Sequence, residues 1–277
     1  MSNRNHLSIK SLRISLLQTD IIWENKEANL FHLYNNLKQL KGTTDIVVLP
    51  EMFTTGFSMN SHELAEPVDG NTIQTLQRWA SEFQLAIVGS YIASSYSLSS
   101  ANAEERQYYN RGFFITPEQT AYYYDKHHLF RMGNESENFS PGNNRIIIPF
   151  RGWNILLLVC YDLRFPVWSR NVNNEYDLLI YVANWPKSRR QVWHTLLQAR
   201  AIENMSYVCG VNRVGKDGNN IAYQGGSMLF SAKGELLSSC EDDKENYTTF
   251  SLDYSSLNEF REKFPAWKDA DPFHILS

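Results

Sequence analysis

The sequence predicts a single α/β domain in which helices cover a buried sheet. Apolar runs of strand length alternate with helical patterns along the whole chain, which favours this class. Hydrophobic residues make up 43% of the 277 residues, enough for a sizeable core. The clearest run, residues 155–159, is apolar at every position, as expected of a strand buried on both faces.

The first half of the chain begins with a strand and a helix. Asn25 is expected to cap that helix, whose apolar residues repeat at helical spacing to Leu40, and Gly42 ends it. Residues 94–107 are small and polar without periodicity, so they are interpreted as a surface loop. Strands are expected at 13–18, 45–49, 85–91 and 109–116, and a second helix at 72–83.

The second half continues the alternation. Pro166 suits the first position of a short helix after the 155–159 strand. The domain core is expected to span about 11–255, and the tail 264–277, aromatic residues among charges, could dock on a partner subunit or on its own core. Further strands are expected at 120–124, 145–149, 177–183, 206–212, 227–231 and 248–252, and a long helix at 191–204.

Composition and charge exclude several classes of protein. A net charge of −4 offers no basic surface for nucleic acid or anionic membrane, and the one tight basic cluster, 187–190, is interpreted as a solvated turn. No run approaches the roughly 18 apolar residues of a membrane span. Three cysteines without CxxC spacing argue against disulfides and structural zinc. With a short polar start at 1–5, the chain is predicted to be cytoplasmic.

Three reactive residues follow predicted strands: Glu51, Lys126 and Cys160. A cysteine nucleophile needs a base for its proton and a cation for the oxyanion that forms, and these residue types supply both. The helix expected at Pro166 would lower the pKa of the thiol through its dipole. Each residue alone has an ordinary interpretation: a packed cysteine, and an acid and a lysine solvated in loops.

Three stretches containing these residues resemble the signatures of the carbon–nitrogen hydrolase (nitrilase-like) superfamily. They are Leu49-Pro50-Glu51, residues 124–130 and residues 159–166, in the family's order. Tyr161-Asp162 stands where nitrilases proper usually show Trp-Glu, which favours an amidase. Further stretches are similar to the bacterial omega-amidase branch: 183–186 followed by 192–193 and 196–204, then 210–215 and 264–271.

The resemblance implies a four-layer α-β-β-α sandwich and a Glu–Lys–Cys triad on Glu51, Lys126 and Cys160. A second family glutamate matches Glu135, and Glu137 is close enough to be the match instead. The family uses no metal or organic cofactor and usually assembles as dimers or larger homo-oligomers. The resemblance therefore predicts a homodimer or larger assembly acting on a small amide.

The branch implies a cysteine-dependent amidase that hydrolyses 2-oxo dicarboxylic acid monoamides, such as 2-oxoglutaramate, through a thioester. Arg164 is a candidate for the substrate carboxylate, because a guanidinium binds carboxylate bidentately; a structural salt bridge with Asp162 or a nearby acid would explain it equally well. The backbone N–H of Tyr161 would hold the oxyanion. Phe130 and Trp185 would shape the pocket.

Different functions fit parts of the same pattern. Another amidase of the superfamily, such as deaminated glutathione amidase, shares the motif around Cys160. A catalytically silent binding homologue or a redox-sensing thiol would also carry a buried cysteine at this position. A papain-type Cys–His site is disfavoured, because no CGxCW-like setting surrounds Cys160. His127, His128, His194, Cys209 and Cys240 are interpreted as ordinary residues.

Overall fold

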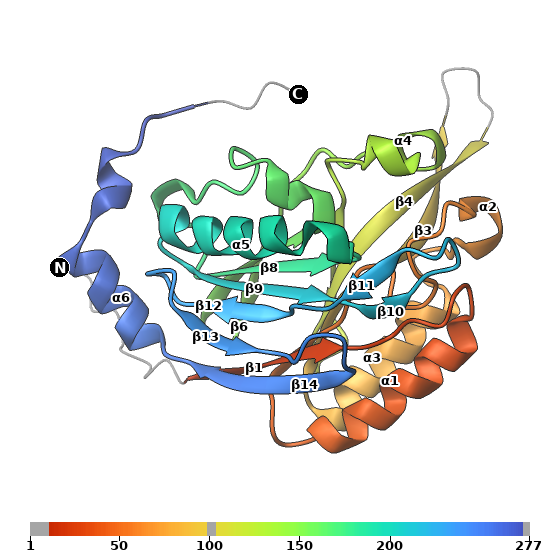
Figure 1. Cartoon of the computed structure of the whole chain (residues 1–277), viewed down its shortest axis with the longest axis horizontal. Helices are drawn as coiled ribbons and strands as arrows, with labels where there is room; N and C mark the ends of the chain where they lie inside the picture. Colours follow the sequence, from red (N-terminus) through yellow and green to blue (C-terminus); the bar gives the residue numbers. More distant parts are fainter. Residues whose placement is uncertain (1–10, 99–103, 274–277) are drawn as a thin grey trace.

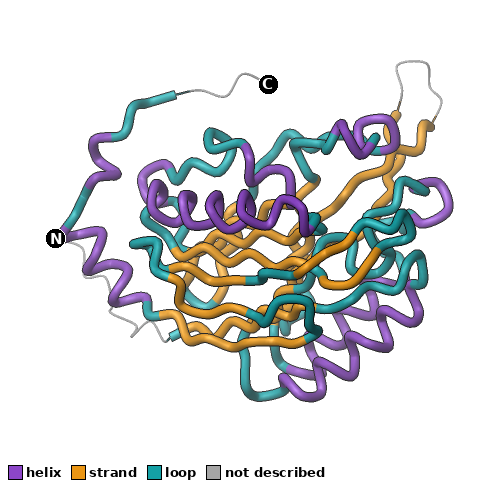
Figure 2. Tube along the Cα trace, in the orientation of Figure 1, coloured by secondary structure: helices purple, strands orange, loops and turns teal. Residues whose placement is uncertain are grey.

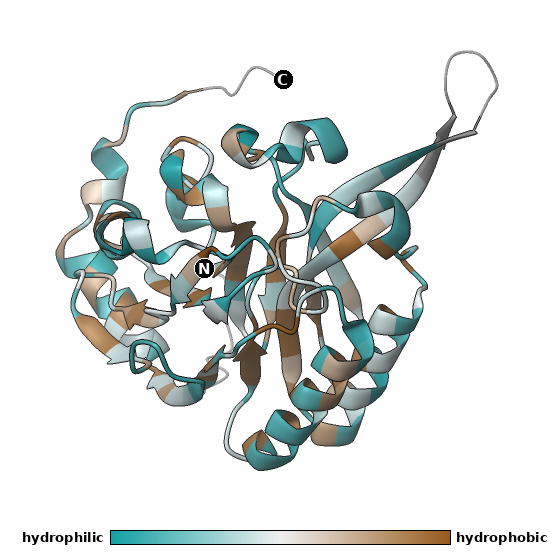
Figure 3. Cartoon of the chain, turned by 45° about the vertical axis from the view of Figure 1, so that its right-hand side comes forward, coloured by the Kyte–Doolittle hydropathy of each residue, from teal (hydrophilic) through white to brown (hydrophobic). Residues whose placement is uncertain are grey.

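The computed structural model describes residues 11–98 and 104–273 as two stacked six-stranded sheets flanked by helices (Figure 1). This confirms the α/β class and the sandwich expected from the resemblance. The first sheet has the order β14-β1-β2-β3-β4-β5, and the second β13-β12-β9-β8-β7-β6. One core cluster contains buried residues of both sheets, such as Leu16 and Leu157. Figure 3 shows the hydrophobic residues gathered on these central strands.

The first sheet combines parallel and antiparallel strands. Its centre, β1-β2-β3, is parallel, whereas β4, β5 and β14 join by antiparallel pairing. Its strands are β1 (Leu12–Gln18), β2 (Ile46–Val48), β3 (Ala86–Leu98), β4 (Glu104–Ile115), β5 (Ala121–Asp125) and β14 (Asn246–Leu252).

The second sheet has a parallel centre too, β7-β8-β9, extended at both edges by antiparallel strands. A separate two-stranded ribbon pairs β10 with β11. The strands are β6 (Ile147–Phe150), β7 (Trp153–Val159), β8 (Leu178–Ala183), β9 (Tyr207–Asn212), β10 (Val214–Lys216), β11 (Ala222–Gln224), β12 (Met228–Phe230) and β13 (Leu236–Ser239).

Helices cover the outer faces of the sheets: α1 and α3 lie on one side and α5 on the other (Figures 1 and 2). Asn25 caps α1 as predicted, its Oδ1 accepting from the N–H of Ala28 at 3.1 Å. The α-helices are α1 (Lys26–Leu40), α2 (Ser61–Leu64), α3 (Asn71–Phe83), α4 (Glu135–Asn138), α5 (Arg190–Asn204) and α6 (Tyr254–Lys263). The short 3-10 helices are η1 (Arg131–Gly133), η2 (Cys160–Arg164), η3 (Val172–Asn174), η4 (Lys187–Arg189) and η5 (Ala266–Asp269).

Two predictions about local structure are wrong. Residues 94–107 are not a loop in the parts described, because β3 and β4 pair from Ile87–Ile115 out to Leu98–Glu104 and extend beyond the other strands (Figure 1). Backbone hydrogen bonds between β3 and β4 hold this hairpin together. Because such pairing does not require apolar and polar residues to alternate, the sequence shows no strand pattern there. The helix after β7 begins at Cys160 and ends at Arg164, so Pro166 follows it in a turn.

The C-terminal part contains elements that the sequence pattern did not indicate: β10, β11, β13 and α6. Arg261 fastens α6 to the core, because its guanidinium pairs with Asp177 at 2.8 Å and donates to the carbonyl of Tyr176 at 2.7 Å. In the tail, Phe264 is exposed. Residues 1–5 and the tail residues Ile275 and Leu276 lie outside the described part of the chain. No helix within 11–98 and 104–273 is long and apolar enough to cross a membrane.

Candidate active site

Parallel strands bring three of the candidate residues to one edge of the sandwich. Glu51 follows β2, Cys160 follows β7 directly, and Lys126 follows β5 directly. β5 runs parallel to β3, because both are antiparallel to the β4 strand between them. Open α/β sheets bind their ligands at the carboxyl ends of parallel strands, and this edge is such a place.

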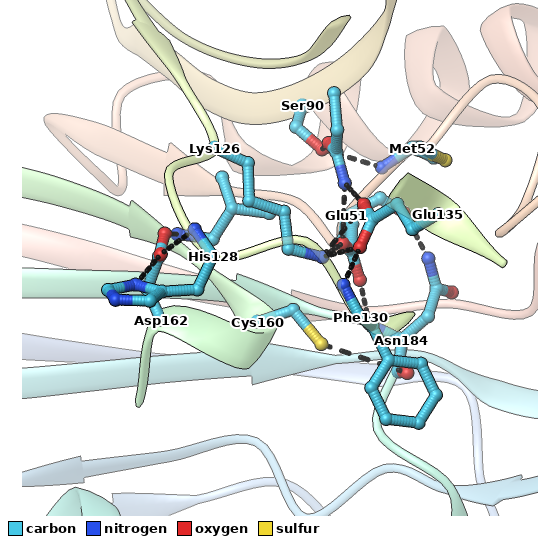
Figure 4. Close-up of polar contacts among 12 residues, drawn as sticks. Glu51, Met52, Ser90, Lys126, His128, Phe130, Glu135, Cys160, Asp162 and Asn184 are labelled. Atoms are coloured by element: carbon cyan, nitrogen blue, oxygen red, sulfur yellow. Dashed lines mark hydrogen bonds and ion pairs between the residues drawn. The ribbon is translucent and has the colours of Figure 1, made fainter. Parts of the chain in front are cut away.

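Glu51, Lys126 and Glu135 form a buried cluster, and Cys160 lies beside it (Figure 4). The Lys126 ammonium lies 2.9 Å from Glu51 Oε1 and 2.9 Å from each carboxylate oxygen of Glu135. The side chains of Lys126, Glu51 and Glu135 are inaccessible to solvent. Glu135 begins α4, whereas Glu137, the second possible match, lies exposed on the same helix. The structure thus brings Glu135 into the cluster and leaves Glu137 out of it.

The charges in this cluster perturb one another strongly. Burial alone would lower the pKa of Lys126, but the carboxylates of Glu135 and Glu51 raise that pKa above its ordinary value. Burial raises the pKa of Glu135, the charge of Glu51 raises it further, and Lys126 opposes both. One ammonium between two carboxylates therefore remains protonated, so it can serve as a fixed positive charge.

Cys160 stands beside this cluster in an unusual backbone conformation. Its φ is +44°, in the left-handed region that costs a non-glycine residue about 1–3 kcal/mol. Its Sγ lies 3.9 Å from the carbonyl oxygen of Asn184, and the residue as a whole is 8% exposed. The thiol points towards the Asn184 carbonyl (Figure 4), and Cys160 lines the cavity described below.

The expectation that a helix dipole lowers the pKa of this thiol is wrong. Burial raises the pKa of Cys160 well above its ordinary value, and the charge of Glu51 raises it further, while Lys126 opposes them. The five-residue helix that starts at Cys160 does not outweigh these effects. The thiol is therefore protonated at neutral pH, and a base must remove its proton before it can act as a nucleophile.

Asp162 ties the Cys160 turn to the segment after β5. Its Oδ2 accepts from the hydroxyl of Tyr124 at 2.7 Å and the N–H of Val159 at 3.1 Å. Its Oδ1 accepts from the N–H of His128 at 2.9 Å and contacts that ring's Nδ1 at 2.8 Å. His128 also stacks on Phe165, with ring centroids 3.7 Å apart. Because these contacts engage it, His128 is a packing residue and Asp162 is not the partner of Arg164.

Two asparagines complete the cluster, and neither was among the residues predicted from the sequence. Asn184 follows β8 and donates its N–H to Glu51 Oε2 at 2.8 Å and its amide to the Glu51 carbonyl at 2.7 Å. Asn110 lies within β4 and donates to Glu51 Oε1 at 2.7 Å and Glu135 Oε1 at 2.9 Å. Asn184 directly follows a predicted strand, so its position could have indicated a site residue. Asn110 lies in the middle of a strand, where no feature of the sequence indicates such a role.

A cavity of about 220 Å³ opens beside Cys160. Tyr161, Phe130, Trp185 and Arg164, the residues expected to contact a substrate, all line it. Other aromatic and apolar side chains complete the wall, among them Phe57, Met59, Ile221 and Tyr223.

Two arginines line this cavity, and each lies over an aromatic ring. Arg164 Cζ lies 5.2 Å from the centre of the Trp185 ring, and Arg189 Cζ lies 5.2 Å from that of Phe130. Neither forms a salt bridge with any acid in the described ranges 11–98 and 104–273. Arg189, which belongs to the basic cluster interpreted as a solvated turn, therefore places a second positive charge at the cavity.

Comparison with known proteins agrees with this geometry. Residues 13–262 match the family model described as carbon-nitrogen hydrolase. The omega-amidase YafV of Escherichia coli K12 is 44% identical over 95% of this chain and 98% of its own. A 2-oxoglutaramate amidase of Bacillus subtilis is 30% identical over 92% of this chain and 96% of its own.

A solved structure has the same fold. The crystal structure of XC1258 from Xanthomonas campestris, described as a CN-hydrolase superfamily protein with an arsenic adduct in its active site, superimposes with a TM-score of 0.89. It is 38% identical, and the match covers 96% of this chain and 99% of that one. The resemblance stated from the sequence motifs is thereby confirmed.

Proposed function

This chain belongs to the carbon-nitrogen hydrolase family, and we propose that within it the chain acts as a cysteine-dependent omega-amidase. It is a hydrolase of amide carbon–nitrogen bonds. The proposed reaction converts the terminal amide of a 2-oxo dicarboxylic acid monoamide to the acid and ammonia. The observation that carries the proposal is the buried Glu51–Lys126–Glu135 cluster beside the Cys160 thiol.

In the first half-reaction Glu51 accepts the proton of the Cys160 thiol, and the sulfur attacks the amide carbonyl carbon. The raised pKa of the thiol supports the need for this base. The negative charge that develops on the carbonyl oxygen is stabilised by Lys126 and the backbone N–H of Tyr161. Glu51 then gives its proton to the departing nitrogen, ammonia leaves, and the acyl group remains on sulfur as a thioester.

In the second half-reaction water replaces ammonia. Glu51, again a carboxylate, accepts a proton from the water as its oxygen attacks the thioester carbonyl. The same donors hold the second oxyanion. The carbon–sulfur bond breaks, Cys160 regains its proton from Glu51, and the carboxylic acid leaves. Glu135 stays in place as the second counter-charge of Lys126.

The charges at the cavity support the proposed substrate class. A 2-oxo dicarboxylic monoamide carries its free carboxylate at the end opposite the amide. Arg164 would bind that carboxylate, since its guanidinium faces the cavity without an acid partner among the described residues. The aromatic walls would cover the carbon chain between the two ends.

A panel of amides tests this proposal. Ammonia release by the wild-type protein is measured with 2-oxoglutaramate, with glutaramate, which lacks the oxo group, and with deaminated glutathione. We expect the highest kcat/KM for 2-oxoglutaramate. Preference for deaminated glutathione would assign the chain to that amidase instead, and no ammonia from any of the three would reject amidase activity on this substrate class.

We also propose that the chain is a cytoplasmic homodimer, with the tail at its interface. The three cysteines are free thiols, which suits a reducing compartment. Figure 1 shows the chain leaving the sheets after α6, and Phe264 and Phe273 are exposed there. Sedimentation of the intact protein and of a Phe264→Asp variant tests this: a dimer that the substitution dissociates is expected, and a monomeric wild type would refute it.

A further inference from the structure

We propose that Asn110 is a positioning residue that holds Glu51 and Glu135 in their ionised form, and that Ser90 fixes the orientation of the Asn110 amide. The inference rests on the proposed function for one of its two readouts only. It concerns two residues outside the Glu–Lys–Cys triad, and it follows from a chain of hydrogen bonds in which every donor can be assigned.

The chain begins at the residue after Glu51. The N–H of Met52 donates to Ser90 Oγ at 2.8 Å, so the Ser90 hydroxyl is an acceptor there. Its single hydrogen is then free to donate to Asn110 Oδ1, 3.0 Å away. Together with the two carboxylates on the other side of the amide, this bond places the Asn110 oxygen towards Ser90 and the amide nitrogen towards Glu51 and Glu135.

Both hydrogens of that nitrogen are used. Asn110 Nδ2 donates to Glu51 Oε1 at 2.7 Å and to Glu135 Oε1 at 2.9 Å. The opposite orientation of the amide would set a third oxygen against the two carboxylates and leave the Ser90 hydroxyl without its acceptor. The Asn110 backbone carbonyl in addition accepts the N–H of Lys126 at 3.0 Å, so one residue contacts all three charged members of the cluster.

These hydrogen bonds lie in a part of the site that solvent does not reach. Ser90, Asn110, Glu51 and Glu135 are all fully buried, so water does not replace a lost donor there without rearrangement. Two carboxylates share the single Lys126 ammonium, and burial and the charge of Glu51 raise the pKa of Glu135. The other titratable groups that act on this pair are Cys160 and, through its interaction with Glu51, Tyr223.

Asn110 stabilises the charged form of both acids without adding a charge of its own. A hydrogen bond to an ionised carboxylate favours ionisation, so its loss favours protonation. A protonated Glu51 does not accept the thiol proton. Removing Asn110 is therefore expected to shift the acidic limb of the pH dependence to higher pH, whereas a residue that only supports folding would leave that limb in place.

The first readout is the pH profile of kcat/KM for 2-oxoglutaramate in the intact protein. Asn110→Leu, which keeps the size of the side chain and removes both donors, is expected to move the acidic limb up by about one pH unit. Ser90→Ala is expected to move the acidic limb in the same direction by a smaller amount. If Asn110→Leu fails to fold, the result for Ser90→Ala alone tests the inference.

The matched control is Asn171→Leu. Asn171 is also a buried asparagine, and its Nδ2 donates to the carbonyls of Tyr176 and Asn204 at 2.9 and 3.0 Å, away from the cluster. Its substitution is expected to lower thermal stability without moving the acidic limb. A shift in this control equal to that of the Asn110 and Ser90 variants would overturn the inference.

The second readout needs no substrate. Alkylation of Cys160 by iodoacetamide requires Glu51 to accept the thiol proton, so the alkylation rate decreases at low pH. In the Asn110 and Ser90 variants this decrease should occur at a higher pH than in the wild type. A shift here with a wild type that releases no ammonia would reject the proposed function and support this inference. If Ser90→Ala and Asn110→Leu fold and the acidic limbs of both pH profiles stay at the wild-type pH, the inference is overturned, whatever the activity.

Discussion

Removal of Lys126 should destabilise the protein through its buried charges. Lys126→Met leaves the Glu51 and Glu135 carboxylates in a site that water does not reach, without the three 2.9 Å contacts to the ammonium. Breaking one buried ion pair costs about 3–5 kcal/mol, because the remaining charge stays desolvated. Against a total stability of about 5–15 kcal/mol, we expect a loss of at least about 3 kcal/mol.

Charge neutralisation should recover most of this loss. In Lys126→Met with Glu51→Gln and Glu135→Gln, the cluster carries no charge, so the penalty for buried anions disappears. Urea unfolding at pH 7, followed by circular dichroism, measures all the variants. A Lys126→Met protein within about 1 kcal/mol of the wild type, or a triple variant no more stable than the single one, would refute this reasoning.

Three further predictions follow from the site. Asp162→Asn exchanges an acceptor of four hydrogen bonds for an amide that cannot accept them all, so the free energy of unfolding should fall by about 1–3 kcal/mol; an unchanged urea midpoint would contradict this. Cys160→Gly should be about 1 kcal/mol more stable than Cys160→Ala, because glycine accepts a φ of +44°; equal melting temperatures would count against strain there. Arg164→Gln should raise KM for 2-oxoglutaramate about 10- to 100-fold with little change in kcat, and an unaltered KM would exclude it from carboxylate binding.

The fold and the reactive positions could be predicted because both depend on local pattern. Glu51, Lys126 and Cys160 each follow a recognisable apolar strand, and the parallel arrangement of such strands brings their carboxyl ends to one edge. Arg189 could not be placed in the same way. Its neighbours in the sequence are basic and polar, and only the packing of its guanidinium on Phe130, far earlier in the chain, directs it to the cavity.

Other features depend on long-range packing that no local pattern records. Asn110 is one polar residue in a strand, and its role depends on Glu51, which lies 59 residues away in the sequence. The sequence predicts that the pKa of Cys160 is lowered, whereas the structure raises it. The sequence shows the helix that follows Cys160, but it does not show the burial that distant segments impose. The β3–β4 hairpin escapes prediction because exposed pairing does not require apolar alternation.

The most direct test of the proposed chemistry compares two cysteine variants. Cys160→Ala removes the thiol beside the charged cluster, and Cys209→Ala removes another buried thiol, in β9, that has no charged partner among the described residues. Ammonia release from 2-oxoglutaramate is measured for both and for the wild type at equal concentration. We expect release by the wild type and Cys209→Ala and none by Cys160→Ala. Release by Cys160→Ala at the wild-type rate would place the reaction elsewhere and contradict a thioester on Cys160.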